Sequence, residues 1–143
     1  MTANRALKLL AWPAAIWIAY ELLWYEQYKL TGPTLVFEVL GAWLGVPEIA
    51  FRWCVGLMEV TAAMLVLIPR TRTFGAAFAF GIMSGAIFFH VISPLGIDPY
   101  HDGGVLFHEA CLTWAVALFV MLAERDELLG IAGRFVPALR PAT

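Results

Sequence analysis

The sequence predicts an all-α integral membrane protein, a bundle of four membrane-spanning helices with a short interfacial or re-entrant helix between the first two. Hydrophobic residues make up 62% of the chain and charged residues only 14%, which lies well outside the composition of a soluble domain of 143 residues. Four apolar runs are each long enough to cross about 30 Å of hydrocarbon. We therefore treat residues 1–143 as a single transmembrane domain.

The first span is expected over residues 7–28 and is interpreted as a retained helix, because no small-residue cleavage site follows its apolar run. Pro13 falls in the first turns of this span, where a missing backbone N–H costs least. Four residues recur at helical spacing and line one face: Trp17, Glu21, Trp24 and Tyr28. An ionisable Glu21 is expected to point into the bundle, whereas the Trp and Tyr residues near the end of the span favour an interfacial aromatic belt.

A short helix is expected over residues 34–46, which are too few to cross the hydrocarbon at about 1.5 Å per residue. One face of this segment is apolar, and the other carries Glu38 and two glycines. This pattern is typical of a helix that lies in the membrane interface or re-enters it. We expect the helix at the outer mouth of the bundle.

The second span is expected over residues 49–68 and ends at Pro69. Arg52 near its start and Glu59 near its middle are seven residues apart and therefore share a face. A charge at the centre of a bilayer costs about 2.5–3.5 kcal/mol on insertion scales. Glu59 is therefore expected to hold a proton, to pair or to line water, and it is the strongest single functional candidate in the sequence.

The third span is expected over residues 74–92 and the fourth over residues 104–123. The third span contains small residues that let membrane helices approach closely, namely Gly75, Gly81, Ser84, Gly85 and Ala86. The fourth span exits into an acidic turn, and residues 124–143 are expected to form a weakly amphipathic cytoplasmic tail on the membrane surface.

Basic residues are concentrated at one end of the predicted bundle. They flank the termini and the turn between the second and third spans: Arg5, Lys8, Arg70, Arg72, Arg125, Arg134 and Arg140. Only Lys29 and Arg52 fall at the other end. By the positive-inside rule both termini are cytoplasmic. The loop with His101, Asp98 and Asp102 then faces outward, and we interpret it as a solvated turn.

Ionisable residues of all four spans are expected in the outer half of the bundle, whereas the cytoplasmic halves contribute essentially none. From the rise per residue, His90, His108 and Glu109 are expected roughly 5 Å below the outer helix ends. Glu21 is expected at roughly 10 Å and Glu59 at roughly 15 Å. A short loop joins the third and fourth spans, so His90 and His108 can face each other. These groups are therefore expected to converge on a common cavity.

Three interpretations of this cavity remain open. In the first, it binds a quinone or another isoprenoid-like molecule, and Glu59, His90 and His108 act as catalytic groups that move protons to and from the polar head. The residues expected to bind the ligand are Trp17, Glu21, Arg52, Trp53, Phe89 and Glu109. In the second interpretation, a transition metal is the cofactor, and in the third the polar groups form an internal network that specifies how the helices pack.

The metal site would consist of His90, His108 and Glu109, since helix bundles build such sites from facing helices. The adjacent His108 and Glu109 diverge by about 100° around a helix and cannot both point at one centre without distortion. The chain also lacks the Glu-x-x-His spacing of di-iron bundles.

Composition restricts the partners. Nine scattered Lys and Arg residues and a net charge of −2 give no basic face for nucleic acid. The expected partners are membrane lipids, a hydrophobic small molecule, and other membrane subunits or further copies of the chain. Cys54 and Cys111 are interpreted as small hydrophobic residues, with a disulfide or redox pair as the alternative.

A family pattern runs from residue 52 to residue 118. Its elements are Gly56-Leu57-Met58-Glu59, Leu67-Ile68-Pro69, Gly75, Ala86 and His90. This pattern resembles that of DoxX-like proteins, which are small four-helix membrane proteins. The resemblance implies a prokaryotic inner-membrane protein. Some members are subunits of a quinone-reducing thiosulfate oxidoreductase, and more distant relatives bind or isomerise sterol-like lipids with intramembrane carboxylates.

The resemblance thus implies a quinone-linked oxidoreductase subunit, a lipid-binding protein or an accessory subunit of a larger membrane complex. This sequence has no cysteine pair that would handle sulfur compounds in an obvious way, so thiosulfate is not expected as the substrate.

Overall fold

The computed structural model describes residues 3–126, which form five α-helices joined by short turns and loops. The helices are α1 (Ala3–Thr31), α2 (Leu35–Leu44), α3 (Glu48–Leu67), α4 (Arg72–Ile92) and α5 (Val105–Ala123). All but α2 are long and apolar enough to cross a membrane. The predicted four-span bundle with a short helix after the first span is therefore confirmed. The predicted surface tail lies outside the described residues from residue 127 onward.

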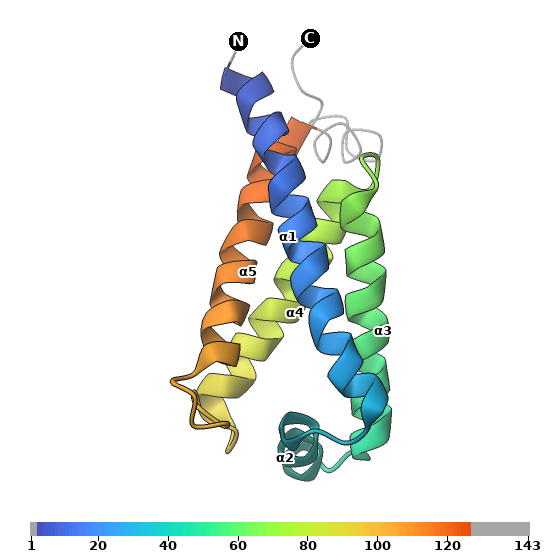
Figure 1. Cartoon of the computed structure of the whole chain (residues 1–143), viewed down its shortest axis with the longest axis vertical. Helices are drawn as coiled ribbons and strands as arrows, with labels where there is room; N and C mark the ends of the chain where they lie inside the picture. Colours follow the sequence, from blue (N-terminus) through green and yellow to red (C-terminus); the bar gives the residue numbers. More distant parts are fainter. Residues whose placement is uncertain (1–2, 127–143) are drawn as a thin grey trace, which may run out of the picture.

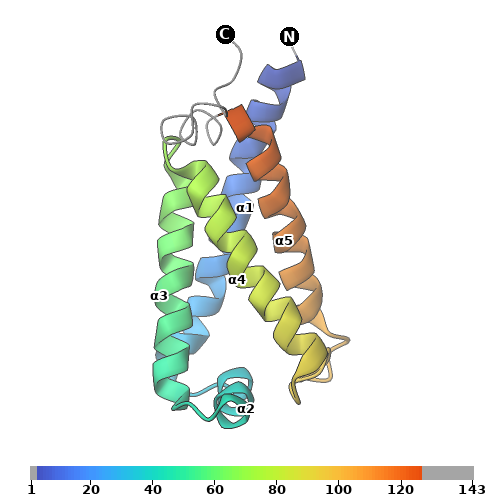
Figure 2. The ribbon, with the colours of Figure 1, turned by 180° about the vertical axis from the view of Figure 1, so that it is seen from behind.

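The four long helices form a ring in which α1 and α4 are diagonally opposed and each packs against both α3 and α5. The start of α1, the turn between α3 and α4, and the end of α5 gather at one end of the bundle (Figures 1 and 2). The short helix α2 and the loop between α4 and α5 lie at the opposite end. We call this opposite end the α2 end.

The helix α4 runs diagonally, beside α3 at its start and beside α5 at its end (Figure 2). Gly75 sets the close start, because a Cβ atom at this position would lie 2.2 Å from the backbone nitrogen of Val66. Further along, the Trp114 indole donates a hydrogen bond to Ser84 Oγ at 2.9 Å and ties α4 to α5. The bundle is therefore closed near the turn between α3 and α4 and splayed at the α2 end.

Small residues fill much of the core, with alanines from every long helix at 7% exposure or less. The buried alanines are Ala11, Ala15, Ala19, Ala62, Ala63, Ala76, Ala79, Ala110, Ala117 and Ala123. Short side chains let helix backbones approach closely in a membrane, where the hydrophobic effect between helices is absent. Larger apolar side chains such as Leu57 and Leu122 point outward, where acyl chains would surround them.

One ion pair at the closed end corrects the expectation that this half lacks ionisable groups. Arg72 at the start of α4 donates to Glu124 Oε1 at 3.1 Å, and both residues are at least 96% buried. The guanidinium also stacks over the ring of Trp12, 3.9 Å from its centroid. Arg72 was expected in the basic turn between the second and third spans, but it is the first residue of α4 and faces the core.

The position of Pro13 was also predicted wrongly. The helix α1 already begins at Ala3, so Pro13 lies in its interior rather than in its first turns. The polar residues before the apolar run therefore belong to the same helix, and Pro13 removes one backbone hydrogen bond from it. At its other end α1 extends past residue 28 to Thr31.

The short helix α2 buries Phe37, Leu40 and Gly41 against the bundle. Gly45 follows the last residue of α2 and caps the helix. Its φ of 71° is the left-handed conformation that glycine adopts at helix C-termini. Leu35 and Trp43 on its other side are more than 40% exposed. The helix thus covers the α2 end with one apolar face and presents a second apolar face outward.

Candidate functional site

A cavity of about 610 Å³ lies at the α2 end, where the long helices splay apart. All five helices line it, and most of the lining is apolar. The splay follows from the packing described above, since α4 leaves α3 beyond Gly75 and α2 covers the resulting opening. The bundle thus contains a partly open space of the size that accommodates small organic ligands.

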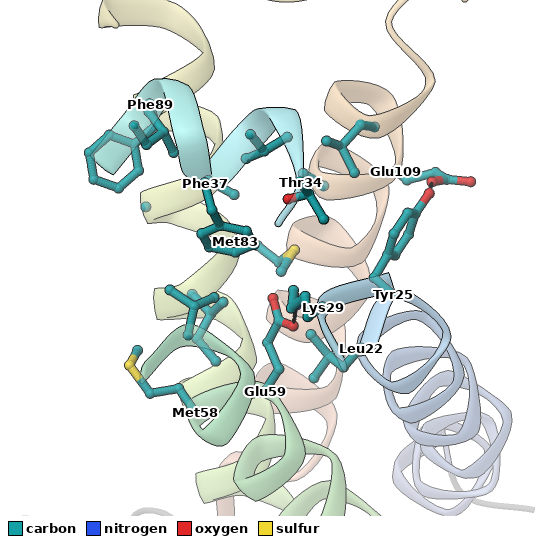
Figure 3. A pocket seen from close by; sticks show the side chains of 18 of the residues that line it. Leu22, Tyr25, Lys29, Thr34, Phe37, Met58, Glu59, Met83, Phe89 and Glu109 are labelled. Atoms are coloured by element: carbon teal, nitrogen blue, oxygen red, sulfur yellow. Dashed lines mark hydrogen bonds and ion pairs between the residues drawn. The ribbon is translucent and has the colours of Figure 1, made fainter. Parts of the chain in front are cut away.

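Lys29 is the charged centre of one wall of the cavity. Its Nζ lies 3.0 Å from Glu26 Oε1 on the same helix and pairs with Glu59 on α3 (Figure 3). The ammonium also lies 5.9 Å from the centroid of the Phe37 ring on α2. Three helices therefore meet at Lys29. Glu59, the strongest candidate from sequence, lines the cavity and pairs with a cation, which is one of the three states expected for it.

Arg52 supports this wall from outside the cavity. Its Nε donates to Glu48 Oε1 at 2.7 Å, and its Nη1 donates to the backbone oxygen of Lys29. That carbonyl lies in the last turn of α1, where backbone acceptors have no partner within the helix. Arg52 therefore fixes the end of α1 to α3. It does not line the cavity and does not pair with Glu59, although the two share a face of α3.

A second polar pair lies on the side of the cavity formed by α1 and α5. The Tyr25 hydroxyl donates a hydrogen bond to Glu109 Oε2 (Figure 3). Glu21, one turn before Tyr25 on α1, is 7% exposed and also lines the cavity, as predicted. Tyr25 and Lys29 follow Glu21 at steps of four residues, so one face of α1 presents all three groups to the cavity.

His90 lines the cavity near the end of α4 and is 3% exposed. Its Nδ1 lies 2.6 Å from the backbone oxygen of Gly96. A carbonyl can only accept, so Nδ1 carries a proton in this contact, and Nε2 is an acceptor whenever the ring is neutral. Phe89 beside it also lines the cavity, as predicted.

His108 does not join His90. It is exposed on α5, lies outside the cavity lining, and places its Nδ1 2.8 Å from the backbone oxygen of Gly104. Within residues 3–126 no group of three or more His, Cys, Asp or Glu side chains is placed to hold a metal ion. The structure therefore does not bring the predicted metal set of His90, His108 and Glu109 together. The physical reason is the divergence of about 100° between neighbours on a helix, which turns Glu109 inward and His108 outward.

Two predicted aromatic residues also lie away from the cavity. Trp53 is 54% exposed because its neighbour Arg52 takes the inward position on α3. Trp17 is half-buried on α1, and its indole N–H is buried with no partner among the described residues. Cys54 lines the cavity and Cys111 does not, and both are free thiols, so the alternative of a disulfide is not observed.

The outward loop between α4 and α5 uses its carboxylates to hold its own backbone. Asp98 accepts from the N–H of Asp102 at 2.9 Å, and Asp102 in turn accepts from the N–H of Val105 at 3.0 Å. Loss of solvation raises the pKa of Asp98, but the N–H groups of residues 102–104 and the nearby His101 outweigh it and lower this pKa below its ordinary value. These groups shape the loop and stay outside the cavity lining.

Sequence reasoning missed the roles of Lys29, Glu26 and Tyr25. Lys29 was counted only as one of the two basic residues at the outer end of the bundle. The spacing of Lys29 could have predicted its inward position. It follows Glu21 by eight residues and Glu26 by three, and it therefore shares their side of the helix.

No family model, curated protein or solved structure matches this chain. The fold and the site alone define its class. It is a multi-pass helical membrane protein with an apolar internal cavity whose wall carries acidic residues, a lysine and a histidine.

Proposed function

We propose that this protein binds a quinone or another isoprenoid-like molecule in the cavity at the α2 end, as a redox-linked component of a membrane. The observation that carries the proposal is the cavity itself, which is largely apolar and about 610 Å³ in volume. Ligand sites of this size typically combine an apolar lining with a few placed polar groups. The described wall has this composition.

Each part of the wall has a role in this proposal. Phe37, Phe51 and Phe89 form an edge-to-face aromatic group on α2, α3 and α4, which suits a flat ring or an isoprenoid chain. Lys29 offers donor hydrogens to a carbonyl oxygen. Glu59, which pairs with the Lys29 ammonium, is a carboxylate that can accept a proton.

His90 completes the set of groups that can move protons, since it lies in the same lining and its Nε2 can take up and release a proton while Nδ1 donates to Gly96. In an oxidoreductase subunit, Glu59 and His90 would take up and return the protons that accompany quinone reduction. His108 was expected to share this role, but it is not part of the proposal because it lies outside the cavity lining. Binding without turnover remains the second form of the proposal, since Glu59 already has Lys29 as its partner.

The resemblance to DoxX-like proteins supports the proposal at the positions that shape and line the cavity. Glu59 and His90 belong to the family pattern and line the cavity. Gly75 also belongs to the pattern, and its close contact with α3 sets the direction in which α4 diverges. We propose on the same basis that the chain is a prokaryotic inner-membrane protein. The concentration of Lys and Arg at the closed end supports cytoplasmic termini.

The test is the identity of the molecule that accompanies the purified protein. Gly85 lines the cavity, and a Cβ atom there would meet no other atom within 4 Å, so Gly85→Leu fills cavity space without a clash at Cβ. Ala115→Leu on the exposed side of the same bundle adds the same side chain outside the cavity.

Organic extracts of the three detergent-purified proteins are compared by mass spectrometry. The proposal expects a stoichiometric quinone or isoprenoid in the wild type and in Ala115→Leu, and a strong loss in Gly85→Leu. Absence of such a molecule from the wild type, or an equal amount in all three proteins, would overturn it. A visible absorption change on reduction of the extracted complex would favour the redox form over binding alone.

A further inference from the structure

Glu21 is a carboxylate of the cavity wall whose chemistry the proposed function leaves unused. It lies on α1, lines the cavity and is 7% exposed. Within the part of the chain that the structure describes, no hydrogen bond or ion pair reaches its carboxylate. Polar groups inside proteins almost always have a partner, and the carboxylate oxygens of Glu21 keep some accessible surface, so a molecule in the cavity can reach them.

The neighbours of Glu21 do not supply a donor. Tyr25, the nearest hydroxyl along the same face of α1, donates to Glu109 instead. Glu109 itself lies within Coulombic range of Glu21 and repels a negative charge there. The Thr113 hydroxyl, one turn after Glu109 on α5, also lines the cavity and makes no hydrogen bond among the described residues, so it does not serve Glu21 either. The Tyr25 hydroxyl is therefore the one donor that is engaged by the two carboxyl groups of this part of the described wall.

The cation of the cavity is also out of reach. Lys29 lies eight residues further along α1, which corresponds to about 12 Å along the helix axis. Its ammonium is already paired with Glu26 and Glu59. The acidic corner around Glu21 and the basic centre at Lys29 are therefore two separate polar positions on the same wall.

We propose that Glu21 binds the head group of the cavity ligand by accepting a hydrogen bond from it. This assignment rests on the proposed function and narrows its ligand class to an amphiphile whose head is a donor, either a hydroxyl or an ammonium. For a quinone-type ligand it selects the reduced quinol, because a quinol hydroxyl donates whereas a quinone oxygen only accepts. The aromatic lining then holds the apolar body of the ligand.

The experiment compares three compounds that share one apolar chain and differ in the head: farnesol, farnesylamine and the methyl ether of farnesol. Competition of each compound with radiolabelled farnesol is measured on the full-length protein in detergent. A charge-assisted hydrogen bond contributes enough that the alcohol, the amine or both should bind at least about tenfold more tightly than the ether.

Two variants assign that difference to Glu21. Glu21→Leu removes the acceptor and should bring all three compounds to similar affinity. Glu21→Gln keeps an acceptor oxygen without the charge, so it should spare the alcohol and weaken the amine, which separates the two head groups. Glu38→Gln, on the exposed side of α2 and outside the cavity lining, is the matched control and should change nothing.

The possible failures are distinct. If the ether binds wild-type protein as tightly as the alcohol and the amine, the role of Glu21 is wrong. The proposed function survives that result provided that Gly85→Leu still abolishes binding. A preference for the donor head that persists in Glu21→Leu also overturns the assignment. If none of the compounds binds and no isoprenoid is extracted from the protein, the proposed function itself fails.

Discussion

Glu59 on α3 pairs with Lys29 on α1 inside the bundle, and the same ammonium lies 3.0 Å from Glu26. One cation therefore serves two buried carboxylates from two helices. This relationship joins the end of the first span to the middle of the second. It also places a donor and an acceptor side by side on the wall of the cavity.

The shared cation predicts an unequal response to mutation. Lys29→Met leaves Glu26 and Glu59 buried without a partner, which should lower the free energy of unfolding by about 3–5 kcal/mol. Glu59→Gln should cost clearly less, because Lys29 keeps Glu26. Thermal unfolding in detergent, followed by circular dichroism, measures both variants. Equal losses, or a larger loss in Glu59→Gln, would contradict the shared pairing.

The close start of α4 predicts that two glycines of one helix differ in their tolerance of alanine. In Gly75→Ala the new Cβ would lie 2.2 Å from the Val66 nitrogen, so α3 and α4 must separate, at a cost of about 1–3 kcal/mol or more. Gly81→Ala is the control, since a Cβ there meets nothing within 4 Å. It should leave the melting temperature unchanged or raise it. A melting temperature for Gly75→Ala as high as that of the wild type would show that the two helices are not in backbone contact.

The stack of Arg72 on Trp12 predicts that lysine cannot replace arginine here. Arg72→Lys keeps the charge but loses the planar contact with the indole and the Nε donor, which lies 3.4 Å from the Val66 oxygen. We expect a clear fall in melting temperature, whereas Arg70→Lys at the exposed neighbouring turn should be neutral. Identical melting temperatures for the two variants would contradict the buried geometry of Arg72.

The outer loop predicts a pH response at its own amides. The pKa of Asp98 is lowered from its ordinary value of 3.8, so its ionised form is favoured in the folded loop. Its contribution is fully present above that ordinary value and is lost as the pH falls through the lower folded pKa. Hydrogen exchange at the Asp102 amide should therefore be protected at pH 5 and lose protection, relative to the intrinsic rate, in strong acid. Asp98→Ala should lack the protection at pH 5, and protection there equal to that of the wild type would refute the role of Asp98.

Much of the fold was predictable because membrane spans are long and apolar and their limits are set by proline, glycine and charge. The four spans and the short helix lie within a few residues of their expected positions. Glu21 and Glu59 were also placed inward correctly, because an ionisable group within a span avoids acyl chains. Hydropathy and charge alone carry this part of the prediction.

The details of the site were less predictable, because they depend on helix rotation and on tertiary partners. Neighbouring residues of a helix point about 100° apart. Because Glu109 faces inward, His108 faces outward, and because Arg52 faces inward, Trp53 faces outward. The choice of Lys29 rather than Arg52 as partner of Glu59 depends on how α1 crosses α3. A single sequence contains no information on that crossing.

The most direct test of the central claim is to map where a photoreactive isoprenoid labels the protein. A diazirine-bearing prenyl chain is irradiated with the purified protein, and fragment ions assign the modified residues. The account predicts labelling at Met83 and Thr113, which face the cavity, and its loss on addition of excess unlabelled isoprenoid. Labelling confined to the outward-facing Met64 and Leu112, and unaffected by competitor, would contradict it.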